Sequence, residues 1–183
     1  MAELKMLAID LGASSGRGII GKFDGNKFTL EENHRFPSEP VTIAGSFNWD
    51  IMRIFHEIKQ AINKCALSDD RDIKTIGIDT WGVDYGLLDK NGHLAGVPRS
   101  YRLGTQEDID AVTAKIPAET LYARTGIDTN LTFNTLYQLY RRKRENDAAL
   151  EIADTMLLTP DLLGYFLTGS IGTEYTIEFV TIK

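Results

Sequence analysis

The stretch MLAIDLGASSGRGIIGKF, residues 6–23, decides the fold class. Residues 6–9 are apolar and predict a short strand, whereas residues 12–16 are small and turn-prone and predict a loop. Residues 17–23 disfavour a helix, because they contain Gly18, Gly21 and the β-branched pair Ile19-Ile20, and they suit a strand. We therefore expect a strand, a loop and a second strand, with no helix directly after the glycines.

A third strand is expected after a turn at Asp24-Gly25-Asn26. Beyond this turn, large side chains recur at even spacing over residues 28–36, interrupted only at Glu32. The first 36 residues therefore predict an antiparallel meander of three strands.

The rest of the chain predicts further strands and mostly helices. Residues 37–45 resemble a linker, and Asn48 or Asp50 can cap a helix with an apolar stripe from Ile51 to Cys65. Residues 73–78 and 83–88 predict two strands around a short loop, with a turn at 89–92. Further helices are expected near 105–115, 118–124 and 133–145, and after a Thr159 cap up to Gly169. The fold class is α/β with a mixed sheet.

Composition excludes several classes of protein. The 183 residues carry 20 Lys and Arg against 26 Asp and Glu, a net charge of −6, which argues against a nucleic-acid or anionic-membrane binder. The single cysteine, Cys65, excludes an intrachain disulfide, and no apolar run is long enough to span a bilayer. The length predicts one core, and the cytoplasm is the expected location.

The first loop, Asp10-Leu11-Gly12-Ala13-Ser14-Ser15-Gly16-Arg17, has the residues of a phosphate site. Glycines and small residues let backbone N–H groups turn toward an anion, the serine hydroxyls add donors, and Arg17 offers charge-assisted bonds. Asp10 would anchor Mg²⁺, through water. The loop is neither a P-loop nor a dinucleotide fingerprint, since both need a helix after the glycines. The alternative is a glycine-rich hairpin connection without a ligand.

The second loop, Asp79-Thr80-Trp81-Gly82-Val83-Asp84, suits a polyhydroxylated ligand. Carboxylates of Asp79 and Asp84 can accept hydrogen bonds from hydroxyls, and Trp81 can lie against the apolar face of a sugar. Gly82 lets a ligand approach the main chain. The alternative is that Trp81 belongs to the core and the two aspartates are solvated loop acids.

Several phrases resemble the FGGY carbohydrate kinases, and within them the kinases of L-rhamnulose. They include residues 8–17, residues 76–84 and Phe133-Asn134-Thr135-Leu136-Tyr137-Gln138-Leu139. Shorter ones are Phe47-Asn48-Trp49-Asp50, Tyr101-Arg102, Pro160-Asp161, Leu167-Thr168-Gly169 and Glu174-Tyr175-Thr176. The resemblance implies an actin-like, ribonuclease-H-like domain, the first of two that close around a cleft.

The resemblance also implies an activity and a set of site residues. The reaction would be the ATP-dependent phosphorylation of L-rhamnulose at its 1-hydroxyl. Residues 13–17 would match the ATP-binding loop, with Gly12 beside it, and Asp10 the acid near Mg²⁺. Gly82 would match the sugar contact, with Asp79, Thr80, Trp81 and Asp84 as its neighbours.

The chain departs from this family in length. Family members are more than twice as long, and their general base, in a Ser-His-Asp phrase, would lie beyond Lys183. Residues 1–183 would then be an incomplete N-terminal domain that is inactive alone and lacks a catalytic residue. The alternatives are a non-catalytic sugar- or protein-binding module, and a kinase of another ketose such as xylulose or fuculose. Self-association through the surface left uncovered is also expected.

Overall fold

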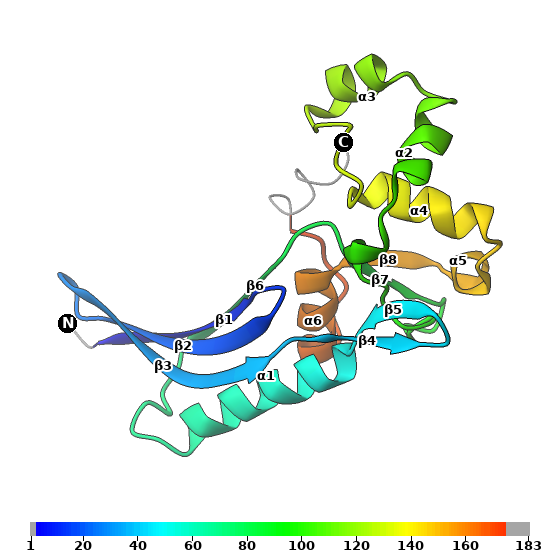
Figure 1. Ribbon diagram of the computed structural model, residues 1–183. Helices are drawn as coiled ribbons and strands as arrows, with labels where there is room; N and C mark the ends of the chain where they lie inside the picture. The colour runs from blue at the N-terminus through cyan, green and yellow to red at the C-terminus, as the bar shows by residue number, and fades with distance from the viewer. Residues whose placement is uncertain (1–2, 175–183) are drawn as a thin grey trace. The chain divides into compact units, whose positions relative to one another are not determined.

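A computed structural model describes residues 3–174 of the protein (Figure 1). In chain order, its elements are β1 (Leu4–Leu11), β2 (Ser15–Phe23), β3 (Phe28–Pro37), β4 (Pro40–Ile43), β5 (Ser46–Trp49), α1 (Ile51–Ala66), β6 (Thr75–Thr80), β7 (Tyr85–Leu88), η1 (Tyr101–Leu103), α2 (Gln106–Thr113), α3 (Ala118–Thr125), α4 (Thr135–Arg144), α5 (Ala148–Ile152), β8 (Thr155–Leu158) and α6 (Thr159–Thr168). The chain folds into two compact units, Met1–Pro40 with Asp50–Trp81 and Val41–Trp49 with Gly82–Lys183. Two units therefore replace the single core that the length predicts.

The first unit contains a four-stranded mixed sheet of order β3-β2-β1-β6. β2 is antiparallel to both β1 and β3, and β6 is parallel to β1. The predicted meander of three strands is thus confirmed, and β6 extends it into a mixed sheet. β2 begins at Ser15, so a strand and not a helix follows the glycine-rich bend.

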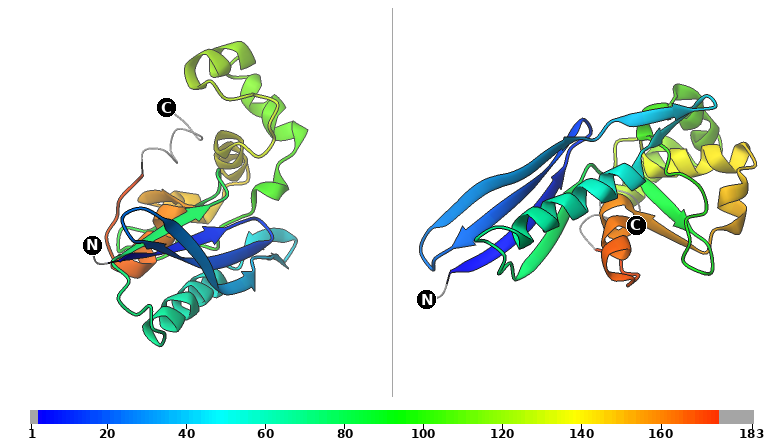
Figure 2. Two further views of the ribbon diagram at one scale, coloured as in Figure 1. Left: turned by 90° about the vertical axis from the view of Figure 1, so that its left-hand side faces the viewer. Right: turned by 90° about the horizontal axis from the view of Figure 1, so that it is seen from below.

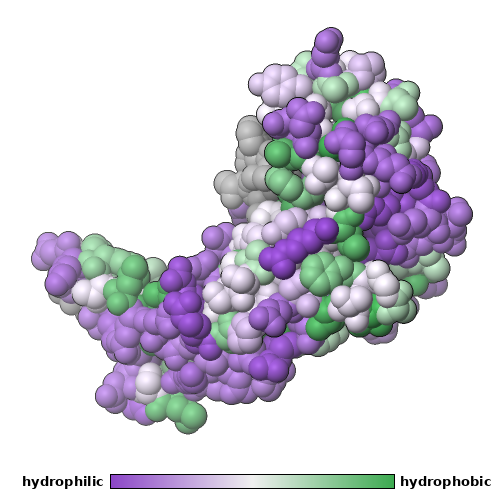
Figure 3. Space-filling view, viewed as in Figure 1, coloured by the Kyte–Doolittle hydropathy of each residue, from purple (hydrophilic) through white to green (hydrophobic). Residues whose placement is uncertain are grey.

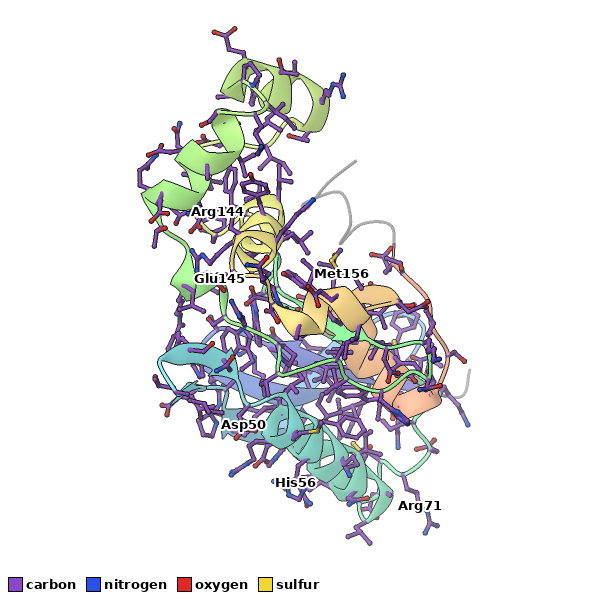
Figure 4. All side chains as sticks on the ribbon, turned by 90° about the vertical axis from the view of Figure 1, so that its right-hand side faces the viewer. Asp50, His56, Arg71, Arg144, Glu145 and Met156 are labelled. Carbon is purple, nitrogen blue, oxygen red and sulfur yellow. The ribbon has the colours of Figure 1, made fainter. Side chains whose placement is uncertain are left out.

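Helix α1 runs along one face of this sheet (Figure 2). Its buried residues recur at helical spacing: Ile51, Ile54, Glu57, Ile58, Ala61 and Cys65. Asp50, labelled at the start of the helix in Figure 4, accepts a hydrogen bond from the backbone N–H of Arg53 at 3.1 Å and is therefore the N-cap. A Cβ added at Gly18 in β2 would lie 2.9 Å from the Cβ of Ala61, so this glycine lets the helix approach the sheet.

The opposite face of the sheet exposes apolar side chains at one end. Leu4, Phe23 and Phe28 are in register across β1, β2 and β3, and Leu30 follows two residues along β3. Their exposed fractions are 42%, 37%, 51% and 68%. We call these four residues the apolar patch; Figure 3 shows hydrophobic residues beside hydrophilic ones at this end of the sheet.

An ion-pair network lies on the α1 side of the sheet. Lys5 in β1 and Lys22 in β2 contact the Asp70 carboxylate at 3.0 and 2.8 Å, and Lys5 also contacts Asp72 at 2.9 Å. Hydrogen bonds from Lys22 and then Lys5 lower the pKa of Asp70 below its usual range. This network joins two strands to the segment after α1.

The second unit contains two small antiparallel sheets, β4-β5 and β7-β8. The β4-β5 hairpin occupies part of the segment 37–45 that the sequence predicts to be a linker. Its turn places Ala44 and Gly45 at φ 48° and 81°, and a left-handed conformation at a non-glycine residue gives no sequence signal. The linker prediction is therefore wrong for residues 40–43.

The segment after Trp81 differs from the predicted strand that begins at Val83. Val83 has φ 73°, which is incompatible with extended backbone, and β7 begins at Tyr85. β7 pairs with β8, whereas β6 pairs with β1. The two strands expected around the short loop are therefore present as β6 and β7 but pair with other strands.

The helices of the second unit agree better with the sequence. The four predicted helices correspond to α2, α3, α4 and α6, whereas α5 and β8 were not predicted. Thr159 is the first residue of α6 and not its cap, which is Leu158. Among the described residues, no helix is both long and apolar enough to cross a membrane.

The basic run at the end of α4 is held by ion pairs. Arg141 and Arg144 contact Asp108 and Glu107 of α2, and Arg142 contacts Asp147 at 2.7 Å. Figure 4 labels Arg144 at this end of α4. Arg142 is buried, so the run packs partly inside the second unit.

Candidate functional site

The first predicted loop begins at the carboxyl end of β1, where four charged residues form a row across the sheet. Asp10 is in register with Asp79 of β6 on one side and Arg17 of β2 on the other, and Arg17 is in register with Arg35 of β3. Residues directly opposite one another on paired strands project from the same face. The sheet thus brings together the starts of both predicted loops, because Asp10 and Asp79 are neighbours.

Asp10 and Arg17 are bound to each other. The Nε and Nη2 atoms of Arg17 both lie 2.7 Å from Oδ2 of Asp10. The two side chains are 39% and 44% exposed, and an ion pair that exposed adds little stability. A charged ligand can therefore exchange for either partner at small energetic cost.

The bend between β1 and β2 is closed by short hydrogen bonds. The N–H of Gly12 donates to the carbonyl of Ser15 at 2.9 Å. Ser38, which is fully buried, donates from its hydroxyl to the carbonyl of Gly12 at 2.5 Å and from its N–H to the carbonyl of Ser14 at 3.2 Å. Ser14 is exposed, while Ala13 is half-buried. The sequence did not predict this role of Ser38, because the residues around it form no motif that indicates a contact with the bend.

Gly16 plays a different part from the other residues of the loop. It is buried, and a Cβ added there would overlap the ring of Phe36 and lie 2.7 Å from Cδ2 of Leu11. Its missing side chain allows close packing of β2, while Gly12 and Ser14 form the accessible part of the bend.

The second predicted loop passes from the first unit to the second. In the first unit, Asp79 is exposed, Trp81 is half-buried, and the hydroxyl of Thr80 donates to the carbonyl of Trp81 at 2.8 Å. In the second unit, Gly82 is half-buried and Asp84 is only 1% exposed. The alternative that both aspartates are solvated is therefore wrong for Asp84.

The Asp84 carboxylate is enclosed by donors from three segments. Oδ2 accepts hydrogen bonds from Nε1 of Trp49 at 2.5 Å and from the N–H of Tyr101 at 3.2 Å. Oδ1 accepts one from Nε2 of Gln138 at 3.1 Å. Trp49, Tyr101 and Gln138 were not predicted as site residues, although each lies in a phrase that carries the family resemblance.

Asp10 fits the requirements of a magnesium anchor in one respect. Mg²⁺ in phosphate sites takes one or two carboxylates and keeps several waters, and Asp10 is an accessible carboxylate beside the bend. In the part of the chain that the structure describes, no group of three or more His, Cys, Asp or Glu side chains could hold a metal. A metal at Asp10 would thus depend on phosphate and water for its other ligands.

These features define a class of protein. A strand, a glycine-rich bend and a second strand, extended by a parallel third partner, form an actin-like, ribonuclease-H-like α/β domain. The model of the FGGY family of carbohydrate kinases, N-terminal domain, matches residues 5–178. The chain belongs to this family.

Similar proteins sharpen this assignment. The chain is 43% identical over 174 residues to a rhamnulokinase of Bacteroides thetaiotaomicron. The matched region covers 93% of the chain and 35% of that protein. It is 42% identical over 179 residues to a rhamnulokinase of Mannheimia succiniciproducens, covering 96% and 37%. The chain thus spans about a third of the length of these curated relatives.

Solved structures of sugar kinases share the fold. A ligand-bound xylulose kinase from Lactobacillus acidophilus superposes with a TM-score of 0.82 at 17% identity, covering 97% of the chain and 36% of that structure. A gluconate kinase from the same organism gives 0.81 at 16% identity, covering 98% and 36%. The actin-like fold expected from the sequence is confirmed.

Tyr175, Thr176 and the tail 177–183 lie outside the described residues.

Proposed function

We propose that the chain is an incomplete N-terminal domain of an ATP-dependent kinase that phosphorylates L-rhamnulose at its 1-hydroxyl, in the cytoplasm. The observation that carries this proposal is its 42–43% identity to two rhamnulokinases along at least 93% of the chain. The likeness to xylulose and gluconate kinases supports the fold alone. A substrate such as xylulose or fuculose is the alternative within the same class.

In this proposal the bend after β1 binds the phosphates of ATP. Backbone N–H groups of the bend and the hydroxyls of Ser14 and Ser15 would donate to phosphate oxygens. Arg17 would leave Asp10 for a phosphate, and Asp10 would then anchor Mg²⁺ through water, so that each charge exchanges one partner for another. The metal would supply charge neutralisation on the phosphates.

The sugar would bind at the second loop. Gly82 would contact the ketose, and Trp81 would lie against its apolar face. The Asp79 carboxylate would accept hydrogen bonds from the sugar hydroxyls, and the Thr80 hydroxyl would donate to them or accept from them. Asp84 would support the backbone of this loop, because its carboxylate is buried and accepts hydrogen bonds from the second unit. The sequence contains no Ser-His-Asp phrase to supply the base, so we propose that these 183 residues alone do not turn over substrate.

Calorimetric titration of the purified chain tests the sugar assignment. L-rhamnulose should bind more tightly than xylulose or fuculose, and rhamnulose-dependent release of ADP should be absent. Absence of heat with L-rhamnulose at millimolar concentrations would favour a protein-binding module instead. Measurable ADP release would contradict the proposed inactivity.

The nucleotide assignment is tested with two arginines of the charged row. Arg17→Ala should weaken MgATP binding about tenfold, because it removes a charge-assisted bond to phosphate. Arg35→Ala is the matched control, since Arg35 is on the same face and pairs with Glu32 at 3.0 Å. Equal losses for both variants would show a general effect of charge and would contradict a specific role for Arg17.

A further inference from the structure

Val83 has an unusual backbone for its residue type. Its φ of 73° lies in the left-handed region, which β-branched residues rarely adopt, and the residue is buried. Glycine would occupy this conformation without strain. The surrounding structure must therefore hold Val83 in place, and such strain is concentrated at functional segments.

Two side chains of α4 hold the carbonyl of Val83. The hydroxyl of Thr135 donates to this oxygen at 2.7 Å, and Nε2 of Gln138 donates to it at 3.1 Å. Thr135 and Gln138 are one turn apart and are both buried, so the two donors come from the same helical face. Hydrogen bonds in such a buried place are strong and costly to leave unmade.

Gln138 links this carbonyl to the next residue. Its Nε2 also lies 3.1 Å from Oδ1 of Asp84 and 2.9 Å from the carbonyl of Phe133. One amide nitrogen thus fixes both the strained peptide and the Asp84 carboxylate. A side chain with an oxygen at that place would face three acceptors, so the site requires a donor.

The remaining contacts of the segment come from other parts of the second unit. Trp49 and Tyr101 donate to the Asp84 carboxylate, and Thr159 donates to the Asp84 carbonyl from its hydroxyl and its N–H, both at 3.0 Å. These three residues lie in or beside the separate phrases around 49, 101 and 160 that carry the family resemblance. Segments that are far apart in the sequence therefore converge on Asp84.

We propose that Thr135 and Gln138 are positioning residues, which hold Val83 in its left-handed conformation and thereby set the backbone of Gly82 for sugar binding. The inference rests on the proposed function, because it takes Gly82 as the sugar contact. It goes beyond that function by assigning a role to two residues that do not touch the ligand. Without the two donors, the peptide at Val83 relaxes and Gly82 moves.

The first experiment measures the conformation of residue 83 by NMR, without any sugar. Backbone scalar couplings of residue 83 and the amide shifts of Gly82 and Asp84 are compared in the wild type, Thr135→Val/Gln138→Met, and the hydroxyl-retaining Thr135→Ser. The double variant should lose the positive φ, whereas T135S should retain it. An unchanged φ in a folded double variant would overturn the proposal.

Tyr137→Phe is the matched control in the same helix. Tyr137 is buried, and its hydroxyl donates to the carbonyl of Thr129 at 2.8 Å, away from Val83. This variant loses one hydrogen bond from α4 and should leave the couplings of residue 83 unchanged. If Y137F shifts them as much as the double variant does, α4 has only a general structural role.

The second experiment measures L-rhamnulose affinity by calorimetry and includes a rescue. The double variant should bind at least tenfold more weakly, and adding Val83→Gly should restore most of the affinity, because glycine keeps a positive φ without the donors. Weak binding that V83G does not rescue would overturn the proposal, as would unchanged affinity when residue 83 has moved. If the wild type binds no sugar, the proposed function fails and the sugar role with it, while the NMR result still decides whether the two donors hold Val83.

Discussion

Asp10 and Asp84 each lie two residues from a glycine of a predicted loop, but their surroundings differ. The Asp10 carboxylate is 39% exposed and pairs with the side chain of Arg17. The Asp84 carboxylate is buried and accepts hydrogen bonds from Trp49, Tyr101 and Gln138. The exposed Asp10 can exchange its partner for a ligand, whereas the buried Asp84 keeps its hydrogen bonds within the protein.

This difference fits the two kinds of ligand in the proposal. A triphosphate with its metal brings high charge, so an exposed ion pair that exchanges at low cost suits it. A neutral sugar brings no charge, and its recognition depends on groups that are already held in place. The stability of single-residue variants tests this contrast.

The largest effect is expected from removing the buried carboxylate. Asp84→Ala removes the acceptor of Trp49 and Tyr101 and one acceptor of Gln138, and should lower the free energy of unfolding by about 3 kcal/mol. Asp10→Ala breaks one exposed pair and should change it by less than about 0.5 kcal/mol. Urea denaturation of both variants measures the two values. Similar losses at the two sites would remove the contrast between an open and an enclosed aspartate.

A second contrast lies within the first loop, between its two glycines. Gly16→Ala places a Cβ against Phe36 and Leu11 and should cost about 2 kcal/mol through overpacking. Gly12→Ala meets only the Ser15 carbonyl, at 3.2 Å, and should cost less than about 1 kcal/mol. Thermal unfolding compares the variants. A larger loss at Gly12 would show that the accessible bend, and not the packing beneath it, limits stability.

The sequence predicted the local features of these regions better than their environments. Strand, bend and strand over residues 6–23 follow from glycine, β-branched and small residues, and the structure has them. The helix from Asp50 follows from its apolar spacing. Both depend on residues that are close together in the chain, so local pattern is sufficient.

The environment of Asp84 could not be predicted, because its partners are 17 to 54 residues away in the chain. Nothing in residues 79–84 indicates that Val83 adopts a left-handed conformation, since its residue type disfavours it and the side chains that donate to its carbonyl, Thr135 and Gln138, lie 52 and 55 residues away. Pattern therefore predicted a strand from Val83. The β4-β5 hairpin was missed for a similar reason, its turn containing Ala44 at positive φ.

A smaller, pH-dependent effect is expected at Asp70, at the far end of the same sheet from the first loop. Hydrogen bonds from Lys22 and Lys5 lower the pKa of Asp70 in the folded protein, so its contribution is present above the unfolded pKa of about 3.9 and is lost as pH falls through the lower folded value. Asp70→Asn should therefore cost about 1 kcal/mol at neutral pH.

Urea unfolding of the wild type and D70N from neutral pH down to about pH 2 measures this effect. The difference between the two proteins should stay constant at neutral pH and shrink in acid. A difference that grows as pH falls would contradict the sign of the pKa shift. The result also separates the loss of stability in acid that is due to Asp70 from any loss that is due to Asp10.

The smallest effect on stability is expected at the apolar patch, on the same open face of the sheet as Asp10. Leu30 is 68% exposed, so Leu30→Lys should change the free energy of unfolding by less than about 0.5 kcal/mol. We expect the isolated chain to self-associate through this patch, because Leu30 adjoins three further exposed apolar side chains. L30K should then shift sedimentation at high concentration toward the monomer.

Leu67→Lys is the matched control, since Leu67 is 90% exposed but lies after α1 and outside the patch. Equal shifts for both variants would mean that added charge alone prevents association, and an unchanged L30K would place the contact on another surface.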